Sequence, residues 1–308
     1  MNTIRTKLML TLAAITVVAS GLSAWLAYSI SRSALEQQSF DKLVAVRELK
    51  SDQVEDFFQG IRHQLVALSE NRMVIEAMAS LSESFKAEKP KTSQGDSSTL
   101  RNFYAQKFLV RAQAAKAPIG NITDIWPDDP LSLRMQSRYI SENPFEVGNK
   151  HLLDQSSSGS TYDNEHAVYH PILRDFAKRF GFYDIFLIDA STGYIVYSVE
   201  KEIDFATSLL DGPYRGSNLA EVFRLTRAAN NANYSRLVDF QAYLPSYGAS
   251  ASFLASPIFS QDEAIGVLVF QVPVERLDNI MTSKRSWSSV GLGETGETYI
   301  VGNDYYLR

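Results

Sequence analysis

The chain has 308 residues, of which 45% are hydrophobic and 21% are charged, and its formal net charge is −5. This composition is typical of a folded globular protein, and the length allows one large domain or two ordinary ones. No long basic run occurs, so nucleic acid is not an expected partner. The absence of cysteine excludes disulfides and cysteine-ligated metal.

The N-terminal segment predicts a membrane anchor. Residues 1–7 carry two basic side chains, and residues 8–30 carry no charge; a transmembrane helix needs about 20 such residues. Trp25 and Tyr28 lie near the far end, where interfacial aromatic residues are expected. A cleaved signal peptide is the alternative, but its apolar region spans only about 7–15 residues. We therefore predict a transmembrane helix over 8–30, with 1–7 in the cytoplasm.

A long stalk helix is expected over residues 31–69. This range has no proline, and Gly60 is its only glycine. Apolar residues recur mostly at gaps of three or four, the helical period, at Leu43, Val46, Val54, Phe57, Ile61, Leu65 and Leu68. Such a seam can pair with a second copy or pack on its own domain. We expect both, with the membrane-near part forming a homodimer.

Two β-hairpins are predicted in the second half of the chain. Their strands are expected at 183–189 and 194–199, and at 252–259 and 264–272. A helix is predicted over 218–229, between the hairpins. Pro257 cannot donate to a ladder, so it belongs at an edge or a bulge. Together these elements predict an α+β fold with a PAS-like antiparallel sheet, in which helices cover one face and the other forms a ligand cup.

A partial repeat follows. The segment GETYIVGNDYYLR (296–308) is similar to the first hairpin, which predicts the start of a second sheet module. The expected organisation is a membrane-distal sensor module over 70–282 and the start of a membrane-proximal module over 283–308, truncated in this chain. A second membrane helix and an output domain are expected beyond it.

Four runs of the sequence are similar to known receptors. The runs are YHPILRDFAKRFGFYDIFLIDASTGYIVYSVEKEIDFATSLLDGPYRGSNLAEVF (169–223), ASFLASPIF (251–259), IGVLVFQVPVERLDNIMT (265–282) and GLGETGETYIVG (291–302). They resemble the double Cache sensor regions of bacterial transmembrane receptors, which include chemoreceptors, sensor histidine kinases and membrane nucleotide cyclases. The resemblance implies two stacked PAS-like modules on the periplasmic side of the inner membrane, with the ligand in the distal module. It leaves open whether the full-length protein is an enzyme. The Arg-x-Trp-Tyr run of amino-acid sensors is absent from the sequence.

Candidate ligand-binding residues lie on the predicted sheet and its loops. An arginine on the helix before the central strand can bind a carboxylate through two N–H groups, strand aromatics can line the cup, and loops on a rigid sheet often carry binding groups. The candidates are Tyr139, Arg174, Tyr183, Phe186, Tyr197, Asp204, Asp211 and Tyr214. Each also has a structural interpretation, as core, turn or solvated surface.

No catalytic residue, metal site or cofactor is predicted. His166 and His170 are four residues apart and could hold a metal through imidazole nitrogens, but a structural role is the commoner case. The leading hypothesis is a small-molecule sensor that relays binding through the stalk and membrane helices to a cytoplasmic output domain. The alternatives are a membrane-anchored extracytoplasmic enzyme and a module that binds a partner protein.

Overall fold

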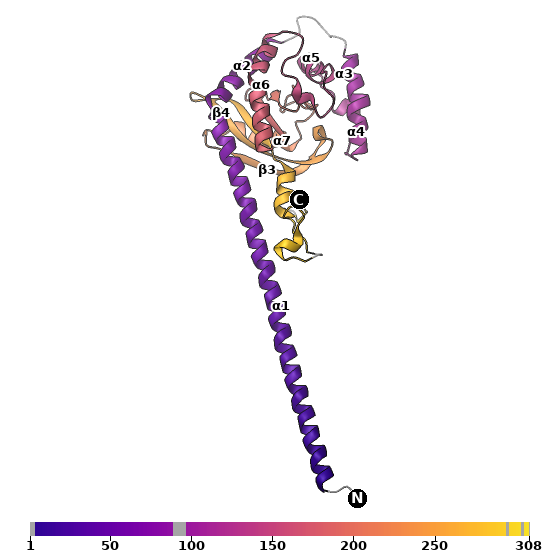
Figure 1. Cartoon of the computed structure of the whole chain (residues 1–308). Helices are drawn as coiled ribbons and strands as arrows, with labels where there is room; N and C mark the ends of the chain where they lie inside the picture. Colours follow the sequence, from indigo (N-terminus) through magenta and orange to yellow (C-terminus); the bar gives the residue numbers. More distant parts are fainter. Residues whose placement is uncertain (1–3, 89–96, 294–295, 303–304, 308) are drawn as a thin grey trace. The chain divides into compact units, whose positions relative to one another are not determined.

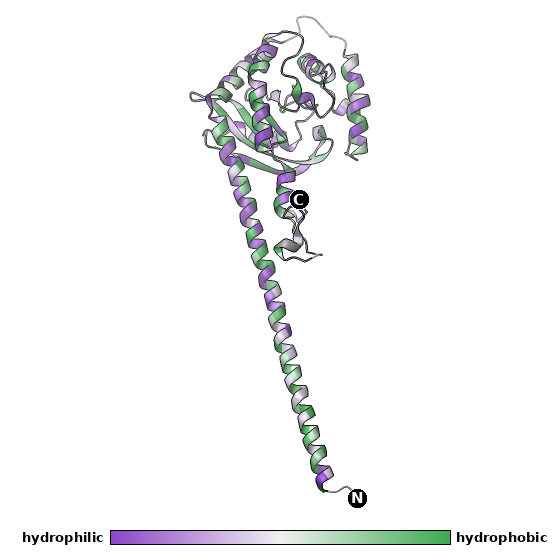
Figure 2. Ribbon diagram, viewed as in Figure 1, coloured by the Kyte–Doolittle hydropathy of each residue, from purple (hydrophilic) through white to green (hydrophobic). Residues whose placement is uncertain are grey.

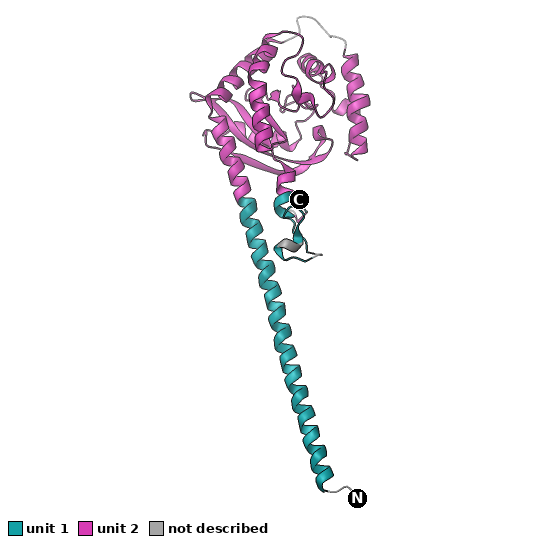
Figure 3. Ribbon diagram, viewed as in Figure 1, with its two compact units in different colours: residues 1–55, 279–301, 307 teal, residues 56–278, 302–306, 308 magenta. Residues whose placement is uncertain are grey.

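The computed structural model describes residues 4–88, 97–293, 296–302 and 305–307 (Figure 1). The chain divides into two compact units, residues 1–55, 279–301 and 307, and residues 56–278, 302–306 and 308 (Figure 3). The fold is α+β, with a long N-terminal helix and a five-stranded antiparallel sheet. The predicted combination of a long helix with a PAS-like sheet is therefore confirmed.

Helix α1 runs without interruption from Ile4 to Ser69. Its first part is apolar (Figure 2), and by length and composition it is the one helix of the described residues that is able to cross a membrane. Further along, Ile61, Leu65 and Leu68 are buried, as their spacing predicts for a face that packs on its own domain. By contrast, Leu43 is 56% exposed.

The sheet contains β1 (Asp184–Asp189), β2 (Ile195–Ser198), β3 (Arg236–Tyr243), β4 (Ala249–Ser260) and β5 (Glu263–Gln271). The strand order is β2-β1-β5-β4-β3, and each neighbouring pair is antiparallel. Both predicted hairpins are confirmed. Strand β3 was not predicted, because its mixed charged and apolar residues, RLVDFQAY, give a weak alternation.

Pro257 lies where β4 has one neighbour only. It is paired with Val267 of β5, while the pairing of β4 with β3 begins at Ala255 and Arg236. The missing N–H of Pro257 therefore removes no bond between β4 and β3, in agreement with its predicted edge position.

Further α-helices in the described part are α2 (Arg72–Ala87), α3 (Ser98–Asn102), α4 (Leu109–Ala114), α5 (Pro130–Gln136), α6 (Thr161–Phe180), α7 (Asn218–Arg227) and α8 (Val274–Met281). Short 3-10 or π-helical turns are η1 (Phe103–Phe108), η2 (Ile122–Asp124), η3 (Ser137–Ser141), η4 (Lys150–Leu152), η5 (Leu244–Ser246) and η6 (Trp287–Val290). Helix α6 begins at a capping box formed by Ser160 and Asp163 and ends at Gly181, whose φ is +74°.

One face of the sheet packs on helices. Phe270 of β5 stacks near Phe182, with ring centroids 4.2 Å apart, and Gly266 of β5 faces Met78 of α2 so closely that a side chain at position 266 would overlap Met78. Glycine therefore lets α2 approach the sheet at this position.

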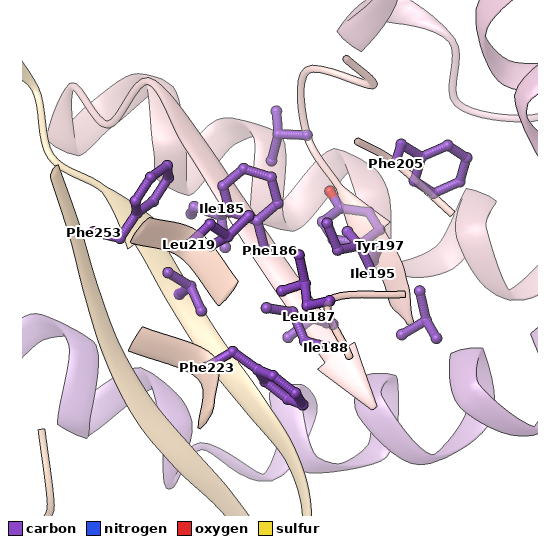
Figure 4. Packing of buried hydrophobic residues seen from close by; sticks show 14 of the residues in the cluster. Ile185, Phe186, Leu187, Ile188, Ile195, Tyr197, Phe205, Leu219, Phe223 and Phe253 are labelled. Atoms are coloured by element: carbon purple, nitrogen blue, oxygen red, sulfur yellow. The ribbon is translucent and has the colours of Figure 1, made fainter. Parts of the chain in front are cut away.

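Because side chains alternate along a strand, Phe186 of β1, Phe253 of β4 and Tyr243 of β3 lie on the opposite face. The rings of Phe186 and Phe253 are 6.1 Å apart, and those of Phe253 and Tyr243 are 5.0 Å apart and edge-on. Figure 4 shows Phe186 and Phe253 among the buried side chains of this core, with Leu219 and Phe223 of α7. We call the face with Phe186, Phe253 and Tyr243 the cup face.

The unit that contains residues 279–301 has one buried cation. Lys50 of α1 donates from Nζ to the carbonyl oxygen of Ile280, and to Ser283 Oγ at 2.6 Å. Within the described part of 283–308, the backbone forms η6 and one bridge between Val301 and Leu307. Residues 303, 304 and 308 of the segment that is similar to the first hairpin lie outside the described residues.

Candidate ligand-binding site

A buried polar cluster lies beside the cup face, on the loop after β2. Tyr243 donates from its hydroxyl to Asp204 Oδ2 at 2.5 Å, and both residues are almost fully buried. The other carboxylate oxygen, Asp204 Oδ1, and the hydroxyl of Tyr214 are buried without a hydrogen-bond partner among the described residues. Buried polar groups in proteins are nearly always hydrogen-bonded, so each of these two atoms has an unused hydrogen-bonding position that a bound group can fill.

The loop that bears Asp204 is held in place by a glutamine from α5. Gln136 donates from Nε2 to the carbonyl oxygens of Ile203 and Phe205, both at 2.8 Å. Its Oε1 accepts a 2.8 Å hydrogen bond from the hydroxyl of Tyr104. These bonds fix the backbone on both sides of Asp204, which orients the carboxylate.

The electrostatics of Asp204 are those of a buried acid without a cation. Burial is the main cause that raises the pKa of Asp204, the hydrogen bond from Tyr243 opposes the shift, and the nearby carboxyl groups of Asp184 and Glu202 add to it, which together give a pKa of about 7. Among the described residues, no lysine, arginine or histidine nitrogen lies within 4.0 Å of the carboxylate. Asp204 is therefore poised to exchange its proton near neutral pH.

Two buried lysines near this loop are already engaged. Lys150 donates from Nζ to the carbonyl oxygen of Lys201 at 2.5 Å and lies 3.3 Å from Glu202 Oε2. Lys201 donates from Nζ to the carbonyl oxygen of Ser198. Its ammonium also faces three aromatic rings, of which the ring of Tyr197 is nearest at 4.7 Å. Burial lowers the pKa of Lys201 to about 7.

The two histidines of α6 form a stacked pair. The rings of His166 and His170 lie 4.4 Å apart. His170 bonds the hydroxyl of Tyr197 at 2.8 Å and the carbonyl oxygen of His151 at 2.7 Å, so its Nε2 carries the proton and its Nδ1 accepts. Burial lowers the pKa of His170 to about 2. The pair thus links α6 to β2 as neutral imidazoles.

An outer pocket of about 640 Å³ opens on the other part of the same loop. It is lined by the carboxylates of Asp124, Asp128, Asp129 and Asp211 and by the guanidinium of Arg215. Arg215 donates to the carbonyl oxygen of Gly212 at 3.3 Å. Four acidic groups against one basic group make this pocket attractive to cations.

Comparisons with known proteins locate no site. No protein-family model matches the chain, and no curated protein matches it. Among solved structures, the sensor domain of the histidine kinase DctB from V. cholerae is similar, with 15% sequence identity over 61% of this chain and a TM-score of 0.30. The chain spans 58% of the length of that structure. The candidate site therefore rests on its own geometry.

The sequence-predicted residues fall into separate places. Asp204 and Tyr214 lie in the buried cluster, and Phe186 lies on the cup face. Tyr139 is also buried, donates to Asp163 Oδ1 at 2.7 Å and, with Tyr197, encloses the ammonium of Lys201.

Three candidates lie outside this interior. Arg174 pairs with Asp154 at 2.5 Å and bonds the carbonyl oxygen of His151. Tyr183 is 42% exposed at the start of β1. Asp211 lines the outer pocket. Asp204 and Tyr214 are thus buried on one loop, whereas these three candidates are not buried.

Tyr243, Gln136 and Lys201 belong to the cluster and were not predicted. Tyr243 ends a strand that the sequence pattern did not reveal, and Gln136 lies in a proline-rich stretch that reads as irregular. A signal was present for Lys201, since it lies in a run of mostly charged residues, Glu200–Asp204, directly after a buried strand, and charged residues are rarely buried unless they have partners.

Proposed function

We propose that this chain is the extracytoplasmic sensing portion of a transmembrane receptor and that a small molecule binds beside the cup face. The observation that carries the proposal is the pair of buried, unpartnered polar atoms, Asp204 Oδ1 and the hydroxyl of Tyr214. They lie on one loop. Burial raises the pKa of Tyr214, and the charges of Tyr104 and Asp204 act in the same direction.

The anchor and the stalk complete this proposal. Residues 8–30 of α1 would span the inner membrane, the sensor module over 70–282 would lie in the periplasm, and residues 283–308 would begin a second module. Membrane-near stalk residues such as Leu43 expose apolar side chains that suit pairing with a second copy. A ligand must bind one conformation of the dimer more tightly than the other in order to transmit a signal.

A thermal-shift screen tests the sensor. The full chain, purified in detergent, is screened against a broad panel of small metabolites, since a ligand that binds only the folded state raises the Tm by mass action. The expected hit loses its effect in Tyr214→Phe, and Tyr299→Phe, at an exposed tyrosine, serves as the matched control. A panel without any hit contradicts the proposal and favours a protein partner.

Disulfide crosslinking tests the relay. The chain has no cysteine, so single cysteines introduced along residues 35–60 report on one contact each. We expect a helical periodicity of crosslinking that shifts when the ligand is added. Crosslinking that is unchanged by a bound ligand would show that the stalk does not transmit the signal.

A further inference from the structure

We propose that the ligand of the buried cluster carries a protonated amino group, which pairs with Asp204. This inference rests on the proposed sensing function and adds the chemical class of the ligand. It is drawn from the balance of donors, acceptors and charges around the loop after β2.

Within the described residues, Asp204 is the charged group of this cluster that has no cationic partner. One carboxylate oxygen accepts from Tyr243, and the other has no donor among the described residues. A ligand hydroxyl would supply a donor but would leave a buried charge unbalanced, which is costly. An ammonium group supplies both an N–H donor and the opposite charge, and such charge-assisted hydrogen bonds are the stronger kind.

The surroundings of Asp204 also favour a cation. After burial, the carboxyl groups of Asp184 and Glu202 are the causes that raise the pKa of Asp204, so two further acidic groups lie near it. The hydroxyl of Tyr214, which has no hydrogen-bond partner among the described residues, can accept from a second N–H. The ring of Tyr243 is held near the carboxylate by its hydroxyl, and aromatic rings attract ammonium groups.

An anionic ligand finds no comparable group. Lys150 is held by Glu202 and by the carbonyl oxygen of Lys201. Lys201 is bonded to the carbonyl oxygen of Ser198 and faces aromatic rings, whose negative faces disfavour an anion. Both buried lysines are thus engaged, whereas Asp204 Oδ1 has no donor among the described residues.

The outer pocket carries a net negative charge, like the carboxylate of the buried site. Its carboxylates, which include Asp128 and Asp211, outnumber the single guanidinium of Arg215. A pocket lined by one sign of charge raises the local concentration of the opposite ion. The loop after β2 contributes to both the outer pocket and the buried cluster. A cation is therefore attracted to the outer surface of this loop, and Asp204 lies on its inner side.

The test uses probes that differ in one functional group. Butyl, hexyl, benzyl and 2-phenylethyl skeletons are each supplied as the primary amine, the alcohol and the carboxylate. Binding to the full chain in detergent at pH 8 is measured by thermal shift and then by calorimetry. We expect at least one amine to bind, and its alcohol and carboxylate counterparts to bind about tenfold more weakly or worse.

Variants locate the bound amine. Asp204→Asn keeps the shape and the acceptor for Tyr243 but removes the charge, and we expect it to weaken amine binding by about tenfold or more. Tyr214→Phe, which removes only the unpartnered hydroxyl, should weaken it several-fold. Asp262→Asn, at an exposed aspartate in the turn between β4 and β5, is the control and should bind like the unmodified chain.

The outcomes separate this inference from the proposed function. An alcohol or carboxylate that binds as well as its amine counterpart, or an amine that binds Asp204→Asn undiminished, overturns the amine inference and leaves the sensor in place. If neither these probes nor the metabolite panel bind, both proposals fail.

Discussion

The hydroxyl of Tyr243 lies 2.5 Å from Asp204 Oδ2 and donates to it, which joins the edge strand β3 to the loop after β2. The two residues are 39 positions apart in the chain. This bond therefore ties together two segments that helix α7 separates in the sequence, and it orients the carboxylate that the proposed ligand would contact.

Removing that bond should destabilise the sensor unit. Tyr243→Phe removes the hydroxyl that donates to Asp204 Oδ2, and we expect a loss of about 1–3 kcal/mol in the free energy of unfolding. Urea denaturation followed by circular dichroism measures the change, with Tyr299→Phe as the exposed control. Equal stability of the two variants would show that Asp204 finds another donor.

The stability of the chain should depend on pH through Asp204. Its folded pKa is raised to about 7 from an ordinary value near 4, so between these values the unfolded state releases the proton and the folded state keeps it. Stability is therefore lost as the pH rises from about 4 to about 7 and stays level above that. Asp184 is raised in the same direction by burial, and so is Glu200.

Asp204→Asn isolates this contribution, because the other acids titrate in both proteins. We expect the Tm of the variant, relative to the unmodified chain, to be higher at pH 8 than at pH 4.5. A difference in Tm that is the same at both pH values would mean that Asp204 is ionised in the folded state throughout. Amine binding should change in the opposite sense and strengthen as the pH rises through 7.

The contact between Met78 of α2 and Gly266 of β5 predicts how substitutions at these two positions change the free energy of unfolding. Gly266→Ala forces the side chain of Met78 to move, and overpacking of this kind costs about 1–3 kcal/mol. Met78→Ala alone should also destabilise, because it leaves a cavity. The double variant should lose less stability than the two single losses added together. Strict additivity in the denaturation data would mean that the two sites are independent.

Charges within the apolar part of α1 should prevent membrane insertion. Val17→Arg combined with Leu22→Arg adds about 2.5–3.5 kcal/mol of insertion cost for each residue. We expect most of this variant to be extracted from membranes by alkaline carbonate, while Gln38→Arg, beyond residues 8–30, remains integrated. Retention of the double variant would argue against a membrane span there.

The elements that the sequence predicted well are those specified locally. The runs 183–189 and 264–272 are mostly apolar because their strands are largely buried on both faces, and they lie within a residue of β1 and β5. Strand β3 escaped prediction because it lies at the edge of the sheet, where only part of its surface is buried and polar residues such as Gln241 are tolerated.

The candidate site was predictable only in part. Asp204 and Tyr214 could be found because loops on a sheet often bear binding groups. Their hydrogen-bonding partners could not be predicted, since Tyr243 and Gln136 reach the loop through long-range contacts. Arg174 is the opposite case. The sequence suggested that its side chain binds a ligand, but in the structure the guanidinium pairs with Asp154 at the surface.

Pro257 limits how far the sheet can extend beside β4. The pairing of β4 with β3 begins at Ala255, so from Pro257 onward β4 is paired with β5 alone. A proline has no backbone hydrogen to donate, so a third strand cannot continue the ladder at this position. Since Pro257 is also buried, this stretch of β4 is closed to a foreign strand both by its backbone chemistry and by its surroundings.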